Sequence, residues 1–207
     1  MTGLKGGPVD IDISVTRPAV IYQRMIQSIV PRPIAWVSTR SAAGVNNLAP
    51  FSFFTGVGSR PPTLLFCPAN NLQGNAKDTL RNIQETGEFV VNVVPAAFTA
   101  AMVATADELP AEKSEFDAAG LTPKPSVHVS APGVAESPIQ FECTKMQIIP
   151  IGDGPGGANI VIGRIVFMSI DDRILNADGD IDPDLLDAVG RMGGPVYCRT
   201  TERFHVS

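Results

Sequence analysis

The feature that most constrains the fold is a pair of long β-prone runs, Ile139–Ile151 and Asn159–Ile170. Between them lies the glycine-rich segment 152–157, which favours a tight reversal of the chain. Two strands joined by a short reversal pair as an antiparallel hairpin. The chain is therefore expected to be mainly β.

Shorter elements are read from hydrophobic spacing. Ala76, Leu80 and Ile83 recur at i, i+4 and i+7, which predicts a short amphipathic helix over residues 76–85. Asn75 is the expected N-cap, with Asp78 completing a capping box. The remaining expectations are strands at 34–39, 63–66 and 89–94, a loop through Gly44, Asn46 and Asn47, a helix over about 96–106, loop with at most short helices over 110–138, a helix beginning at Pro183, and a glycine-rich turn at 190–195.

These elements predict a mainly β (α+β) protein, an antiparallel barrel with peripheral helices. No internal repeat or break divides the chain, so one domain spanning residues 1–207 is expected. A net charge of -5, from 16 Lys and Arg against 21 Asp and Glu, argues against a nucleic-acid partner.

Cysteine and histidine are too scattered for a disulfide framework or a zinc site. Cys67, Cys143 and Cys198 form no C-x-x-C pair, and His128 and His205 lie near none of them. No apolar run is long enough to span a membrane, and residues 1–10 show no secretory signal. A cytoplasmic location without metal is expected.

Three motifs fail in their context. Gly152-x-Gly154-x-x-Gly157 is followed by a strand pattern, whereas a dinucleotide fingerprint requires a helix there. The acidic run 178–184 has no calcium-loop register with both the required glycine and glutamate. His128 has no nucleophile elbow to serve, so a structural role is favoured over a catalytic one. No catalytic side chain is predicted.

A different set of residues suits a mononucleotide. Ser38-Thr39 ends a predicted strand, and residues 48–54 supply an apolar and aromatic patch, as a flat heteroaromatic ring requires. Residues 75–79 open a predicted helix with a lysine and a threonine, which favours an anion. The alternative is that these residues only end a strand and cap a helix.

At these positions the chain resembles the flavin reductase-like family of FMN-binding split barrels. The resemblance is carried by the runs 31–39, 44–52, 77–79 and 87–92, and further by 136–138, 142–143, Gly163, 190–194 and Tyr197. It implies an antiparallel split β-barrel that forms a homodimer with flavin near the subunit interface.

The resemblance also implies which residues bind FMN. Lys77 and Thr79 would hold the phosphate, and Asp78 would serve the helix cap or the ribityl hydroxyls. Phe53 would form a wall of the ring pocket. Arg32 is either a second phosphate ligand or a structural surface residue, and Arg191 and Tyr197 would close over the site. The full set of implied FMN contacts is Ser38, Thr39, Asn46, Asn47, Ala49, Ser52, Phe53, Lys77, Asp78 and Thr79.

The implied activity is NAD(P)H:flavin reduction, with hydride passing from nicotinamide to flavin N5 and a monooxygenase as the candidate partner. Many members carry a Gly-Asp-His-type segment where this chain has Gly157-Ala-Asn159. The absent histidine is associated with nicotinamide binding, so an electron-transfer protein with fixed FMN is the alternative. A third reading replaces FMN with a deazaflavin or haem, although Lys77 and Thr79 argue against haem.

Overall fold

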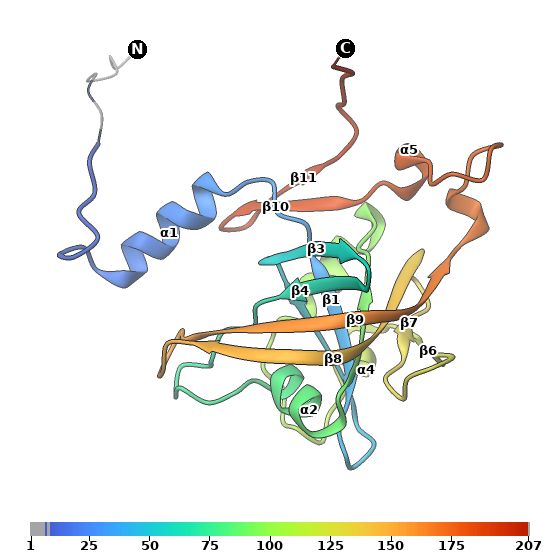
Figure 1. Ribbon diagram of the computed structural model, residues 1–207, viewed down its shortest axis with the longest axis horizontal. Helices are drawn as coiled ribbons and strands as arrows, with labels where there is room; N and C mark the ends of the chain where they lie inside the picture. The colour runs from blue at the N-terminus through green and yellow to red at the C-terminus, as the bar shows by residue number, and fades with distance from the viewer. Residues whose placement is uncertain (1–6, 8, 207) are drawn as a thin grey trace.

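The structure is a computed structural model that describes residue 7 and residues 9–206. Its main sheet contains β1 (Ala35–Arg40), β2 (Asn46–Phe51), β3 (Phe54–Ser59), β4 (Pro62–Phe66), β5 (Glu88–Asn92), β8 (Ile139–Ile151) and β9 (Ala158–Ile170). The strand order is β2-β1-β5-β8-β9-β4-β3, and every neighbouring pair is antiparallel (Figure 1).

The sheet closes on itself because its two edge strands are consecutive in the chain. Only Ser52 and Phe53 separate β2 from β3, although five strands lie between them in the sheet. A flat sheet would hold these edges about 29 Å apart at about 4.8 Å per strand. The connection reaches about 11 Å. The sheet must therefore curl until its edges meet, which confirms the expected split barrel.

The expected long hairpin is confirmed. β8 and β9 pair from Ile139↔Ile170 to Ile151↔Ala158, with two register shifts along the ladder. Gly152, Gly154 and Gly156 have φ of 80°, 74° and 75° in the connecting tip, a backbone region that favours glycine. A strand follows the tip, so the tip is a hairpin turn and not a dinucleotide fingerprint.

Helix α2 (Asp78–Thr86) packs into the barrel core. Leu80 and Ile83 join Phe66 and Phe89 in one cluster of buried side chains. The helix ends at Gly87, which has φ 75° and donates its N–H to the Ile83 carbonyl. The expected N-cap at Asn75 is wrong, because the helix begins at Asp78, two residues after the expected start, with Lys77 at its N-cap. Asn75 instead donates its N–H to Asn71 Oδ1 at 2.8 Å within the preceding loop.

A second cluster lies on the other face of β1, where Trp36 and Ile34 point. It is covered by η1 (Ala96–Phe98), α3 (Thr99–Ala104) and α4 (Glu115–Ala119), and by β7 (Gly133–Val134), which pairs with β6 (Pro123–Lys124). The expected helix over 96–106 is thus divided into a 3-10 turn and a short α-helix. Because both faces of β1 are covered, its residues 35–39 are all buried.

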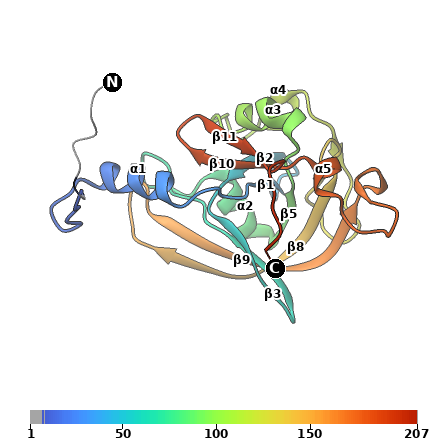
Figure 2. The ribbon, with the colours of Figure 1, turned by 90° about the horizontal axis from the view of Figure 1, so that it is seen from above.

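Three features near the ends of the chain complete the fold. Helix α1 (Pro18–Ser28), which the sequence pattern did not reveal, extends away from the barrel (Figure 2). The expected turn at 190–195 is confirmed only at residues 194–195, because β10 (Val189–Gly193) pairs with β11 (Val196–Arg199) on either side of it. The helix expected from Pro183 is confirmed as α5 (Pro183–Leu186), and η2 (Asp172–Ile174) precedes it.

Within residue 7 and residues 9–206, no helix has the length and apolar character needed to cross a bilayer. Cys67, Cys143 and Cys198 are all free thiols. No cluster of three potential metal-ligating His, Cys, Asp or Glu side chains occurs among the described residues. Most of residues 1–10, where no secretory signal is expected, lies outside the described part of the chain.

Candidate functional site: two adjoining cavities beside the edge strand

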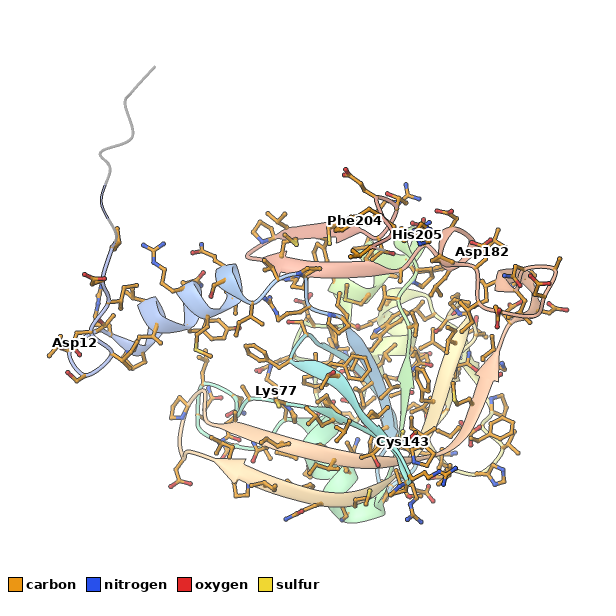
Figure 3. The ribbon with its side chains drawn as sticks, turned by 45° about the horizontal axis from the view of Figure 1, so that its top comes forward. Asp12, Lys77, Cys143, Asp182, Phe204 and His205 are labelled. Atoms are coloured by element: carbon orange, nitrogen blue, oxygen red, sulfur yellow. The ribbon has the colours of Figure 1, made fainter. Side chains whose placement is uncertain are left out.

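The first cavity has a volume of about 300 Å³ and lies between β2 and the start of α2. From β2 it is lined by Asn47 and Ala49, and from α2 and the residue before it by Lys77, Asp78 and Thr79. The structure therefore gathers two runs that are separated by about thirty residues in the chain. Figure 3 shows Lys77 in the body of the molecule and Asp12 on the segment before α1.

The N-terminus of α2 opens into this cavity without a side-chain cap. First-turn N–H groups have no partner within a helix, so an uncapped N-terminus is suited to an anion. Thr79 Oγ1 accepts a hydrogen bond from Asn47 Nδ2 at 2.9 Å. Because a hydroxyl both accepts and donates, this bond leaves the Thr79 hydrogen free for an acceptor in the cavity.

Both cations of the first cavity already have carboxylate neighbours. Lys77 Nζ lies 3.5 Å from Glu108 Oε1, and Arg81 Nη2 lies 2.6 Å from Asp78 Oδ1. These pairs are partly exposed, so each contributes little to stability and exchanges readily for another anion. The Asp78 carboxylate pairs with Arg81, one turn later in α2, so Arg81 offsets the negative charge of Asp78. Arg81 was not among the expected site residues, although its i+3 spacing from Asp78 is a visible signal.

Glu115 is a buried carboxyl group in the wall of the first cavity that the sequence did not reveal. It is 7% exposed, and its Oε2 accepts the backbone N–H of Leu48 at 2.9 Å. Burial raises the pKa of Glu115, the Leu48 hydrogen bond partly offsets this, and the charge of Asp78 adds to the rise. Residue 115 falls in a stretch expected to be mainly loop, so only the tertiary fold brings it here.

Ser38 and Thr39 lie behind the cavity wall. Both are fully buried. Ser38 Oγ donates to the Pro132 carbonyl and accepts from Asn92 Nδ2. Thr39 Oγ1 accepts from Asn82 Nδ2 at 3.0 Å. Neither hydroxyl lines the first cavity in the single chain, and their direct contact with a flavin stays a prediction.

The second cavity has a volume of about 250 Å³ and adjoins the first at Ala106, which lines both. It is lined by Pro50 of β2, by Ser52 just after that strand, and from β10 and β11 by Arg191 and Tyr197. Because strand side chains alternate, Pro50 points to the opposite face of the sheet from Asn47 and Ala49, so the two cavities meet beside the β2 edge. Phe53 follows at the connection to β3, where Arg32 Cζ lies 5.7 Å from the centre of its ring.

Arg32 is a structural residue in this chain. Its Nη1 donates to the carbonyls of Ile26 and Ile29 at the end of α1, at 2.7 and 2.6 Å. Its Nε donates to Ser52 Oγ at 3.2 Å. Of the two readings of Arg32, the geometry favours the structural one, because these bonds tie α1 to the edge strand.

The other expected residues do not line either cavity. Asn46 faces a groove beside Phe116 and Lys113 that shares Leu109 with the first cavity, and its buried Oδ1 has no hydrogen-bond partner among the described residues. His128 lies against Phe167, with ring centres 5.3 Å apart, consistent with the structural reading. Asn159 is buried and donates its Nδ2 to Asn70 Oδ1 at 3.0 Å.

Comparison with known proteins agrees with this architecture. Residues 27–194 match the flavin reductase like domain. The chain is 44% identical over 186 residues to an uncharacterized protein of Halalkalibacterium halodurans, covering 88% of each. It is similar in structure to nitrilotriacetate monooxygenase component B from Bacillus cereus, with 34% identity, a TM-score of 0.91, and coverage of 97% of this chain and 100% of that one. It is also similar to the 2-nitrobenzoate 2-nitroreductase of Pseudomonas fluorescens, with 32% identity, a TM-score of 0.85, and coverage of 96% and 95%.

The split barrel and its matched domain define the class as a flavin oxidoreductase. Within that class, the chain belongs to the flavin reductase-like family.

Proposed function

We propose that this protein is an FMN-dependent oxidoreductase that takes electrons from NAD(P)H. The observation that carries the proposal is the meeting of an uncapped helix N-terminus, Lys77 and Thr79 with the edge strand in one cavity. The helix N-terminus, Lys77 and Thr79 suit a phosphate. The edge strand suits a flat ring with polar edges. The flavin reductase-like family supports flavin as the ligand.

The residues present fit FMN. Lys77, Thr79 and the first turn of α2 would hold the phosphate, with Lys77 exchanging Glu108 for it. Asn47 and Ala49 would face the ribityl chain, and Ser52 and Phe53 the ring. From Asn47 to Phe51 the strand advances about 13 Å, which gives an elongated mononucleotide a support along the β2 edge. Contacts from Asp78 and Asn46 belong to the same proposal, and Ser38 and Thr39 would support the strand from behind.

The chemistry that FMN supplies when bound is acceptance of hydride at N5 from a nicotinamide. Hydride transfer requires no general acid or base, which agrees with a site whose only deeply buried carboxyl group, among the described residues, is bonded to a backbone N–H. The protein would act by orientation: the α2 donors fix one end of the cofactor, and β2 fixes the plane of the other. The apolar residues Ala49, Ala76 and Leu109 would reduce the access of water.

The alternative is an electron-transfer protein with fixed FMN. Asn159 favours it, because this residue stands in the segment where many family members carry a histidine. Its side chain, at the start of β9, is buried and donates to the Pro68 carbonyl and to Asn70 Oδ1 in the segment that follows β4. Anaerobic stopped-flow mixing with NADH and then NADPH separates the two functions. Rapid bleaching of the flavin band supports the reductase, and a band that persists with both donors supports the carrier.

Assembly and partners belong to the same proposal. We infer a homodimer with flavin near its interface, a single functional domain over the whole chain, and a cytoplasmic location in keeping with three free cysteines. Likeness to a protein named as a monooxygenase component supports a monooxygenase that consumes reduced flavin as the partner.

The first experiment is titration of the purified protein with FMN, followed by its visible spectrum. K77Q is expected to weaken FMN binding by at least about tenfold, because it removes a charge-assisted contact to phosphate. K145Q removes a lysine of β8 that lines neither cavity nor the groove beside Asn46, and it is the matched control. Equal FMN affinity in K77Q and the wild type would contradict the phosphate assignment, and no FMN binding at all would overturn the proposed function.

A further inference from the structure

Arg191 is a guanidinium group in the second cavity without a carboxylate partner. Its Cζ lies 4.4 Å from the centre of the Tyr197 ring. Arg81, Arg173, Arg199 and Arg203 each form an ion pair with an aspartate. Among the described residues, no Asp or Glu does so for Arg191, and none lines the second cavity. The lining therefore carries a net positive charge that an anionic ligand could balance.

The positive charge of this cavity is reinforced by Arg32. The two arginines are joined through their backbones, since each donates its N–H to the other's carbonyl, at 3.0 and 2.8 Å. Burial lowers the pKa of Arg191, and the charge of Arg32 lowers it further. The guanidinium of Arg32 is occupied by two carbonyls and a serine, so Arg191 is the one placed to receive an anion.

The rest of the lining is aromatic and apolar. Tyr22 of α1 and Tyr197 of β11 contribute rings, while Met102 and Ile34 contribute apolar surface. The volume of about 250 Å³ lies below the usual range for sites of drug-sized ligands, about 300–1,000 Å³. A single-ring compound suits such a volume, whereas a whole dinucleotide exceeds it. A ring edge against tyrosines and an anion on arginine together describe an aromatic acid.

We propose that the second cavity binds a small aromatic carboxylate, with its carboxylate on Arg191 and its ring against Tyr197 and Tyr22. The cavity adjoins the first at Ala106 and shares β2 with it, so the acid would lie beside the ring end of the flavin. Binding of the acid needs only the second cavity. Its role as the substrate class of the oxidoreductase rests on the proposed function.

The test is calorimetric titration of the FMN-supplemented protein with benzoate, with benzamide as the uncharged analogue and acetate as the anion without a ring. Benzoate is expected to bind more tightly than either. R191Q should weaken the binding of benzoate at least about tenfold and leave the binding of benzamide unchanged, because only the charge-assisted bonds are lost. R191K keeps the charge but loses the planar fork, so its affinity for benzoate should fall between those of the wild type and R191Q. R24Q removes an exposed arginine from α1 and should leave benzoate binding unchanged.

FMN titration and thermal melting of each variant separate the possible failures. An unchanged melting temperature in R191Q shows that the fold is intact. The FMN affinity of R191Q is measured separately, because the resemblance also expects Arg191 to close over the flavin site, and a loss confined to benzoate assigns Arg191 to the acid. Loss of FMN binding by the wild type would overturn the proposed function, while the benzoate titration would still report on the second cavity. The present proposal is overturned if R191Q binds benzoate as the wild type does, or if acetate binds as tightly as benzoate. It is also overturned if benzoate fails to bind. A weaker affinity of R191Q for NADH in that case would assign Arg191 to a dinucleotide.

Discussion

At the scale of single residues, Gly163 shows how closely the barrel core is packed. A Cβ built at this position would lie 2.3 Å from Cζ of Phe89, a ring in the centre of the core. The absence of a side chain on β9 therefore makes room for a large one on β5. The resemblance to the family included this glycine, and the structure supplies the physical reason for it.

We expect G163A to destabilise the protein by about 2–3 kcal/mol, because the added methyl group forces a packed ring to move. Urea unfolding measures the effect. G56A is the matched control, since a Cβ on that β3 glycine meets nothing within 4 Å. Equal midpoints for the two variants would show that Phe89 moves aside at little cost.

Glu115 gives a second residue-scale prediction, on pH. Burial raises its pKa in the folded protein, so the folded state holds this proton more tightly than the unfolded chain. Its contribution to stability is present below the ordinary glutamate pKa of about 4.3 and is lost as the pH rises through the raised value. E115Q keeps an oxygen that can accept the Leu48 N–H but cannot ionise.

The melting temperature of E115Q should therefore rise relative to the wild type as the pH increases from 4.5 to 7.5. E112Q, which removes an exposed carboxylate before the same helix, controls for net charge. A difference between E115Q and the wild type that stays constant with pH would show that Glu115 titrates normally.

At the scale of elements, the strands and helices with strong local signals could be predicted. The β8–β9 hairpin combines long β-prone runs with a glycine-rich tip, and α2 has regular apolar spacing. A loop is expected through Asn46 and Asn47, yet pairing with β1 makes both residues part of strand β2. β3 contains two glycines and is held by β4. Such strands are fixed by their partners, and a single sequence does not display the partners.

The candidate site follows the same division. Lys77, Asp78 and Thr79 are adjacent in sequence, so their meeting in one cavity could be predicted. Glu108 and Glu115 come from a later segment of the chain that lines the same cavity, and no local sequence pattern predicts that they lie there. β10 was read as a turn because of its glycines. Gly193 has φ 115°, and a Cβ there would lie 2.9 Å from the Ile26 carbonyl oxygen, so the glycine permits close approach to α1.

The attachment of α1 is the element-scale prediction. Arg32 is buried and bonds two carbonyls at the end of α1, so R32Q removes charge-assisted bonds at the base of the helix. We expect a loss of about 2 kcal/mol in unfolding free energy and faster amide hydrogen exchange across residues 18–28. R24Q is the control on the exposed side of α1. Unchanged exchange in R32Q would mean that α1 is held by other contacts.

At the scale of the whole molecule, the position of the site follows from the topology. A barrel whose edges meet without pairing leaves the outer edge of β2 free for other groups. Glu115 occupies one N–H of that edge, and the two cavities lie along the remainder. The opening in the barrel is therefore where a ligand can reach strand backbone, which explains why polar and apolar lining residues gather there.

The outer face of β9 provides the last prediction. Val166, Met168 and Ile170 alternate along the strand, so they share one face, and they are 38%, 46% and 38% exposed. A row of exposed apolar side chains on a sheet indicates an interface, and the proposed homodimer supplies a partner for it.

M168D places a charge in the middle of this row. Sedimentation should then show a dimer for the wild type and a monomer for M168D. L72D is the matched control, because Leu72 is 86% exposed in a loop away from β9. A dimer that persists in M168D would place the interface elsewhere, and FMN titration of the monomer would show directly whether one chain holds the cofactor alone.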